Sequence, residues 1–165
     1  TAANYLRLLI FAKKDGHGFV LQAIPLAAKK MYTHEAQKRV RYGETDQMGY
    51  LYYGRYADLY EIGRVEMLRS LGLTYKDMEE NERIMMPVAS MEMRYLRPAK
   101  YDEMLTIRTS LRQLPEKDIV FQTEILNEIG KVVNAGTVRL VFVDMNTKKT
   151  IPAPGFLLEK LRQFF

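Results

Sequence analysis

The stretch that decides the fold spans residues 41–56 and reads Arg41-Tyr42-Gly43-Glu44-Thr45-Asp46-Gln47-Met48-Gly49-Tyr50-Leu51-Tyr52-Tyr53-Gly54-Arg55-Tyr56. It places one acidic residue, Asp46, on a tight turn, and the residues after it have the spacing of a helix. The first N–H groups of a helix have no partner within it and lie at the positive end of its dipole, where they can hold an oxyanion. The stretch therefore predicts a carboxylate beside an anion-binding helix start.

A long helix is predicted over residues 54–71. Its apolar residues recur every three or four positions, and Gly72 is placed to end it. Gly63 lies on the apolar stripe, although a glycine inside a helix costs about 1 kcal/mol relative to alanine. We expect the helix backbone to come close to a flat surface at Gly63, and a sheet is the obvious candidate.

The rest of the chain predicts an antiparallel sheet. A first strand is expected at residues 38–42, a short helical turn from Thr74, and extended segments at residues 84–96, 104–114, 119–127 and 132–143, with a short helix or docked tail at 156–165. The fold class is α+β: about five strands wrapped around one long central helix. One sheet face and an edge strand remain to be covered, which predicts a partner subunit.

The composition excludes several kinds of chemistry. The 165 residues fit one domain with a substantial core, and the absence of cysteine excludes disulfides and thiol nucleophiles. The two histidines, His17 and His34, precede the strand-and-helix pattern that we interpret as the folded domain and that begins at residue 35, so the chain offers almost no residues for a Ser-His-Asp mechanism. No cluster has the spacing of metal ligands, so no metal and no organic cofactor is predicted.

The basic charge is concentrated at the N-terminus. The net charge is +5; residues 1–30 contain five basic residues and one acidic residue, which leaves 20 and 19 for the remainder. Nucleic-acid binding is therefore not predicted. No apolar run approaches the roughly 20 residues needed to span a bilayer, which predicts a water-soluble protein without membrane insertion.

Met31 precedes the first well-patterned segment of the chain. We expect an extension at residues 1–30 and a folded domain at residues 31–165. The extension has two interpretations that the sequence leaves open: it is an upstream read-through, or it is a helical or strand arm packed on the domain.

Two stretches of the sequence are residues 42–56, quoted above, and Arg94-Tyr95-Leu96-Arg97-Pro98-Ala99-Lys100-Tyr101-Asp102-Glu103-Met104-Leu105. Together they resemble the hotdog-fold acyl-CoA thioesterases, in the subgroup similar to 4-hydroxybenzoyl-CoA thioesterase and the Tol-Pal-associated acyl-CoA thioesterase. The resemblance covers about residues 35–150. It implies an acyl-CoA substrate, active sites between the subunits of a homodimer or homotetramer, and a cytoplasmic location. It also implies that Asp46 is the nucleophile or the base for water, and that the backbone N–H at Tyr53 polarises the thioester carbonyl.

Six further residues are candidates for substrate binding. Tyr52, Gly54 and Tyr56 surround the helix start, and Arg94, Arg97 and Lys100 can meet the phosphates of coenzyme A. Each candidate also has a structural interpretation: tyrosines at this spacing pack cores and interfaces, and charges at strand ends are commonly solvated. Asp46 itself can be an ordinary Asx-turn residue.

The chemistry needs neither histidine nor cysteine. An aspartate with a reference pKa of about 3.9 is ionised at neutral pH, and a thiolate leaves with little help from an acid. Two alternatives stay open: a thioesterase acting on acyl groups carried by acyl carrier protein, and a non-catalytic acyl-CoA-binding module in which Asp46 is structural. A hotdog dehydratase is disfavoured by the shortage of histidine. The acyl group itself is not predicted.

Overall fold

The computed structural model describes residues 8–15, 18–25 and 30–165. The chain divides into two compact units, Thr1–Lys30 and Met31–Phe165. In the first unit, β1 (Leu8–Asp15) and β2 (Gly18–Pro25) pair antiparallel, with Leu8 opposite Pro25. One interpretation of residues 1–30 was a helical or a strand arm, and the described backbone there forms a pair of strands. No helix in the described ranges is long and apolar enough to cross a membrane.

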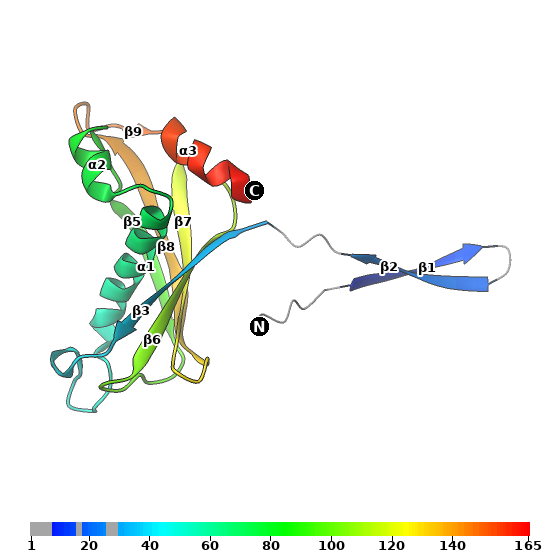
Figure 1. Ribbon diagram of the computed structural model, residues 1–165, viewed down its shortest axis with the longest axis horizontal. Helices are drawn as coiled ribbons and strands as arrows, with labels where there is room; N and C mark the ends of the chain where they lie inside the picture. Colours follow the sequence, from blue (N-terminus) through cyan, green and yellow to red (C-terminus); the bar gives the residue numbers. More distant parts are fainter. Residues whose placement is uncertain (1–7, 16–17, 26–29) are drawn as a thin grey trace. The chain divides into compact units, whose positions relative to one another are not determined.

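The second unit contains an antiparallel sheet of seven strands (Figure 1). The order is β3, β6, β7, β8, and β8 also pairs with β4, β5 and β9. Two of the strands have only two residues each, so five strands make up most of the sheet. Their bounds are β3 (Tyr32–Arg39), β4 (Ile84–Met85), β5 (Val88–Tyr95), β6 (Met104–Leu111), β7 (Asp118–Leu126), β8 (Val132–Asp144) and β9 (Thr150–Ile151).

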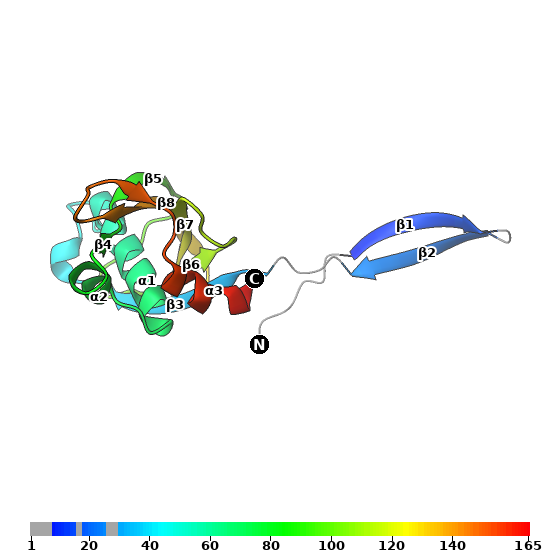
Figure 2. The same ribbon diagram turned by 90° about the horizontal axis from the view of Figure 1, so that it is seen from above.

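The sheet curves around one long helix, as Figure 2 shows from above. A 3₁₀ turn, η2 (Tyr53–Arg55), leads directly into α1 (Tyr56–Ser70). The other helices are η1 (Tyr42–Glu44), α2 (Tyr75–Glu80), α3 (Gly155–Leu161) and η3 (Arg162–Phe164). This arrangement confirms the predicted α+β fold with a sheet wrapped around a central helix.

Strand alternation creates the buried face against α1. In β6 and β7 every second residue is buried, and the residues between them point to the outer face. A Cβ atom on Gly63 of α1 would lie 2.3 Å from Thr109 Oγ1 and 2.7 Å from Ile107 Cγ2. The backbone of α1 therefore touches the sheet at Gly63, which confirms the predicted close approach.

The first strand differs from its prediction. It is β3, which begins at Tyr32 and ends at Arg39, whereas residues 38–42 were expected. His34 lies in this strand opposite Thr109, so the interpretation that both histidines lie outside the folded domain was wrong for His34; His17 lies outside the described residues. The error has a physical origin, because His34 and Lys38 occupy half-buried positions that the alternation rule assigns to apolar residues.

The segment predicted as one strand at residues 84–96 is two strands. Proline has no N–H to donate to a ladder, and Pro87 separates β4 from β5 while its carbonyl accepts a hydrogen bond from Val141 N–H (3.1 Å). β9 was not expected, because two residues are too few for a periodic signal.

Candidate functional site

Asp46 begins a small hairpin-like loop between β3 and α1. Thr45 and Leu51 form an antiparallel bridge, Asp46 N–H donates to the Tyr50 carbonyl (3.0 Å), and Gly49 N–H donates to the Asp46 carbonyl (2.9 Å). Gly49 has φ of 75°, a left-handed conformation that glycine adopts without strain. The loop thus returns the chain so that helix α1 starts ten residues after the acid, at Tyr56.

The Asp46 side chain is half-buried and partly engaged in the turn. Its Oδ1 accepts a hydrogen bond from Met48 N–H (2.9 Å), which is the geometry of an Asx turn. Its Oδ2 accepts no hydrogen bond from any residue in 30–165. The carboxylate is therefore oriented through one oxygen, and the other remains available.

Glu44 anchors the same loop. Its carboxylate accepts hydrogen bonds from Lys38 Nζ (2.5 Å) and from Arg41 N–H (2.8 Å), and its carbonyl accepts one from Tyr52 N–H (2.9 Å). Partial burial acts to raise the pKa of Glu44, but Lys38 and the Arg41 N–H outweigh it and lower that pKa. Glu44 is consequently a charged residue that holds the loop together through hydrogen bonds. Of the two acidic residues on the loop, Asp46 is the one with a carboxylate oxygen that accepts no hydrogen bond from residues 30–165.

The helix start presents two unpaired backbone donors. Arg55 N–H donates to the Tyr52 carbonyl and Tyr56 N–H to the Tyr53 carbonyl, but the N–H groups of Tyr53 and Gly54 donate to nothing in the part of the chain that the structure describes. The side chains of the N-cap residues, Tyr52 for η2 and Arg55 for α1, form no capping hydrogen bond. These two N–H groups therefore have the properties predicted for an oxyanion donor.

Tyrosines surround these donors. The rings of Tyr52 and Tyr53 are 4.5 Å apart, and that of Tyr95 on β5 meets Tyr53 at 6.4 Å and Tyr56 at 5.5 Å, edge to face. The Tyr53 phenol raises the pKa of Tyr52, and the negative charge of Asp46 acts in the same direction. Tyr52 and Tyr53 are exposed, whereas Tyr56 is buried in the core.

The second motif lies against the first. Leu51 N–H donates to the Ala99 carbonyl (2.8 Å), and Tyr50 and Lys100 form a β-bridge, so Lys100 is brought to the Asp46 loop. Arg97 lies two residues beyond β5, and its guanidinium donates to the Val132 carbonyl (2.7 Å). Of the three predicted phosphate-binding cations, the structure brings Lys100 into contact with the loop.

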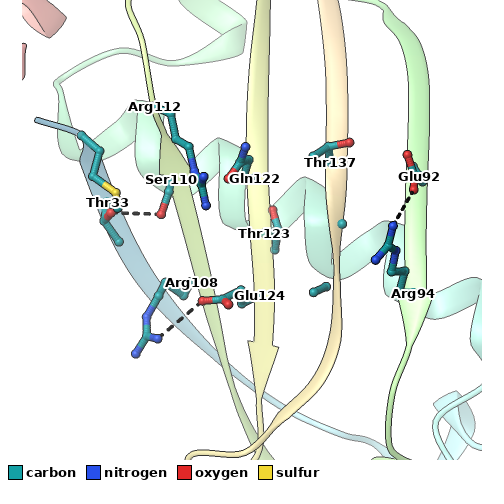
Figure 3. A pocket seen from close by; sticks show the side chains of 13 residues that line it. Thr33, Glu92, Arg94, Arg108, Ser110, Arg112, Gln122, Thr123, Glu124 and Thr137 are labelled. Carbon is teal, nitrogen blue, oxygen red and sulfur yellow. Dashed lines mark hydrogen bonds and ion pairs between the residues drawn. The ribbon is translucent and has the colours of Figure 1, made fainter. Parts of the chain in front are cut away.

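Arg94 lies elsewhere. It lines a hollow on the outer face of the sheet, the face away from α1, together with Glu92, Arg108 and Gln122 (Figure 3). Its guanidinium is 3.8 Å from the Glu92 carboxylate. The neighbouring Tyr95 points to the opposite face because successive side chains alternate along a strand. The structure does not bring Arg94 together with Asp46.

Residues 40–161 match the family model described as Thioesterase-like superfamily. The chain belongs to the thioesterase-like superfamily. It is 31% identical to the acyl-CoA thioester hydrolase YbgC of Escherichia coli O6:H1 over 76% of this chain and 92% of that protein. It is also similar to the DHNA-CoA thioesterase of Staphylococcus aureus, with a TM-score of 0.69 and 29% identity over 81% of this chain and 83% of that one. For the hypothetical protein TT1821 of Thermus thermophilus, the TM-score is 0.72 and the sequence identity is 27%, over 81% of this chain and 98% of that one.

This thioesterase-like chain has one further residue at the site that the sequence reasoning did not single out. The hydroxyl of Tyr95 donates to the Tyr53 carbonyl, whereas in the sequence Tyr95 is only one residue of the second motif. The alternation of Met91, Met93 and Tyr95 was the available signal, since it puts these three side chains on one face of the strand. Within residues 30–165, no three His, Asp or Glu side chains are grouped to hold a metal.

Proposed function

We propose that this protein hydrolyses acyl-CoA thioesters to the free acid and coenzyme A, with Asp46 as the nucleophile or general base. The observation that carries the proposal is a half-buried carboxylate on a loop that leads into the start of α1, where two N–H groups have no hydrogen-bond partner among residues 30–165, in a member of the thioesterase-like superfamily. The names of the relatives support coenzyme A thioesters as the substrate class.

The reaction runs through attack at the thioester carbonyl. As a base, Asp46 takes a proton from water, and the oxygen of that water bonds to the carbonyl carbon; as a nucleophile, its own oxygen forms that bond and water later releases the acid. The carbonyl oxygen becomes an oxyanion held by the N–H groups of Tyr53 and Gly54, a contact whose loss typically costs about 2.7–4 kcal/mol. The C–S bond then breaks. In the general-base route the thiolate takes up the proton held by Asp46. In the nucleophilic route water hydrolyses the acyl–Asp46 anhydride, which releases the acid and restores the carboxylate, and the proton freed in that step goes to the thiolate.

Substrate contacts follow from the same geometry. The Gly54 backbone and the exposed ring of Tyr52 flank the proposed reaction centre, and Lys100 offers a cation to the coenzyme A phosphates. Tyr56 contributes through packing beneath the site, because it is only 3% exposed. Arg97 is a weaker phosphate ligand in this proposal since Val132 already engages its guanidinium. Arg94, on the outer face, contacts only a substrate that extends there.

The active form in this proposal is a homodimer or homotetramer. β5 is an edge strand that carries exposed apolar side chains, including Val88, Met91 and Tyr95, with Leu96 immediately after it. An exposed apolar edge is a template for pairing with another strand. A second copy joined along β5 would cover this edge beside the helix start, and sedimentation of the purified protein tests it: a monomer at micromolar concentration overturns this part.

The hydrolysis experiment measures thiol release from a panel of acyl-CoA esters with a thiol-trapping dye. For Asp46→Asn we expect kcat to fall by about 10²–10⁴-fold, the usual contribution of a positioned acid or base. The matched control is Asp118→Asn, which removes an aspartate on the outer face of the sheet, and it should keep wild-type activity. Equal rates for wild type and Asp46→Asn would refute the role of Asp46.

The same assay separates the alternatives. Faster hydrolysis of acyl groups on acyl carrier protein than of the matching coenzyme A esters would favour a carrier-protein thioesterase. Acyl-CoA binding without hydrolysis by the wild-type protein would favour the binding module, in which Asp46 forms only the turn.

A further inference from the structure

We propose that Tyr95 is a positioning residue for the oxyanion donor, and that its hydroxyl holds the Tyr53–Gly54 peptide at the start of α1. The inference rests on the proposed thioester hydrolysis and adds a residue to its machinery. Tyr95 does not touch the reacting atoms in this proposal. It acts through the backbone group that does.

The contact joins the end of a strand to the first turn of the helix. Tyr95 is the last residue of β5, and its hydroxyl lies 3.4 Å from the Tyr53 carbonyl oxygen, to which it donates, and 3.7 Å from the Met93 sulfur. The Tyr95 ring meets the rings of Tyr53 and Tyr56 edge to face. The side chain therefore spans from the sheet to the helix start by both its ring and its hydroxyl.

The strand that carries Tyr95 is anchored to the element that also holds α1. Tyr95 pairs with Asn134 of β8, and Asn134 Oδ1 accepts a hydrogen bond of 2.6 Å from the hydroxyl of Tyr60, one turn into α1. Both Asn134 and Tyr60 are buried. The distance between β5 and the first turn of α1 is consequently fixed from two sides, so the Tyr95 hydroxyl has a defined target.

The target is one half of the group that would bind the oxyanion. The Tyr53 carbonyl and the Gly54 N–H belong to the same planar peptide unit, so fixing one fixes the direction of the other. A hydrogen bond to the carbonyl also polarises the peptide and makes its N–H a stronger donor. Because the N-cap side chains of η2 and α1 form no capping hydrogen bond, Tyr95 is the side chain among residues 30–165 that holds this turn by a hydrogen bond.

The bond is long for an O–H···O contact, and Tyr95 is 54% exposed in the single chain, before a second copy covers β5. Its contribution to folding stability is therefore small, since an exposed hydroxyl exchanges a protein partner for water. Hydrogen bonds of catalytic groups are often long in the free protein and tighten in the transition-state complex. The effect of Tyr95 should accordingly appear in kcat and leave the unfolding temperature unchanged.

The test is Tyr95→Phe, which keeps the ring and removes the hydroxyl. We expect kcat for an acyl-CoA ester to fall by about three- to tenfold, the size of one uncharged hydrogen bond, with KM and the unfolding temperature unchanged. The control is Tyr101→Phe; Tyr101 is an exposed tyrosine whose ring meets Tyr42 edge to face, and its hydroxyl has no partner among the described residues. It should keep wild-type kcat.

Three outcomes would overturn the inference. An unchanged kcat in Tyr95→Phe removes the positioning role, a rise in KM alone makes Tyr95 a substrate contact, and a fall in unfolding temperature that accounts for the lost activity makes it structural. In each case the wild-type protein still hydrolyses thioesters, so the proposed function stands. A wild-type protein inactive on every coenzyme A and carrier-protein ester overturns both.

Discussion

Replacing Gly63 by alanine tests the contact between α1 and the sheet. In an exposed helix this substitution would stabilise the protein by about 1 kcal/mol, because alanine is the better helix former. Here the new Cβ would lie 2.3 Å from Thr109 Oγ1 and 2.7 Å from Ile107 Cγ2, both closer than real Cβ atoms approach other atoms. Thr109 and Ile107 are fully buried β-branched residues on β6, so neither can swing aside.

The expected result is a net loss of stability. Overpacking a core by one methyl group typically costs about 1–3 kcal/mol, and a contact with buried, β-branched side chains belongs at the upper end. After the helix gain is subtracted, we expect the free energy of unfolding to fall by about 1–2 kcal/mol, which lowers the unfolding temperature by about 3–8 °C in a domain of this size. Urea titration and thermal unfolding followed by circular dichroism measure both quantities.

Gly155→Ala is the matched control. Gly155 is the first residue of α3, and no atom lies within 4 Å of the Cβ it would gain, so the substitution should leave stability unchanged or raise it. Thr109→Ala should partly restore Gly63→Ala, because it removes the nearer of the two clashing atoms, and the double-mutant cycle should give a favourable coupling. A Gly63→Ala protein as stable as the wild type would refute the close packing of α1 on β6.

Two further predictions concern stability. Thr74→Ala should lower the free energy of unfolding by about 1 kcal/mol in a urea titration, because Thr74 Oγ1 caps α2 by accepting from Asp77 N–H (3.0 Å); an unchanged midpoint would contradict the cap. Burial raises the pKa of Tyr56 to about 12, above its ordinary value near 10, so the neutral phenol contributes stability that is complete below pH 10 and lost as the pH rises toward 12. Thermal unfolding in that range should show a smaller pH dependence for Tyr56→Phe than for the wild type, and identical slopes would contradict the assignment.

The long helix and the strands from residue 104 onward could be predicted, because their apolar residues recur with a clear helical or strand period. The helix predicted over residues 54–71 is η2 followed by α1, and the predicted strands from residue 104 onward correspond to β6, β7 and β8. β3 was misplaced, because the half-buried positions of this edge strand hold the polar residues His34 and Lys38, which interrupt the apolar alternation. Periodicity reports burial, and it fails where burial is partial.

The part of the site that is local in sequence, the Asp46 loop and the helix start, was likewise predictable. The part that β5 contributes was not. Asp46, the Gly49 turn and the helix start lie within ten residues, so the sequence alone brings them together. The faces of Arg94 and Tyr95 depend on the register of β5, which shifts at an irregularity between Val88 and Ser90. One extra residue in a strand exchanges the two faces. Without pairing information, Arg94 and Tyr95 were equally good candidates for the helix side.

Asp46 also shows that a turn-forming role and a chemical role can belong to one carboxylate. The hydrogen bond from Met48 N–H occupies Oδ1 and fixes the direction of the carboxylate plane, so Oδ2 is left with one orientation relative to the loop. A carboxylate on a flexible loop would have to be ordered before attack, and that ordering costs free energy in each turnover. Because a thiolate is a good leaving group and needs little help from an acid, one well-oriented carboxylate suffices, and the Asx turn then serves the chemistry as much as the fold.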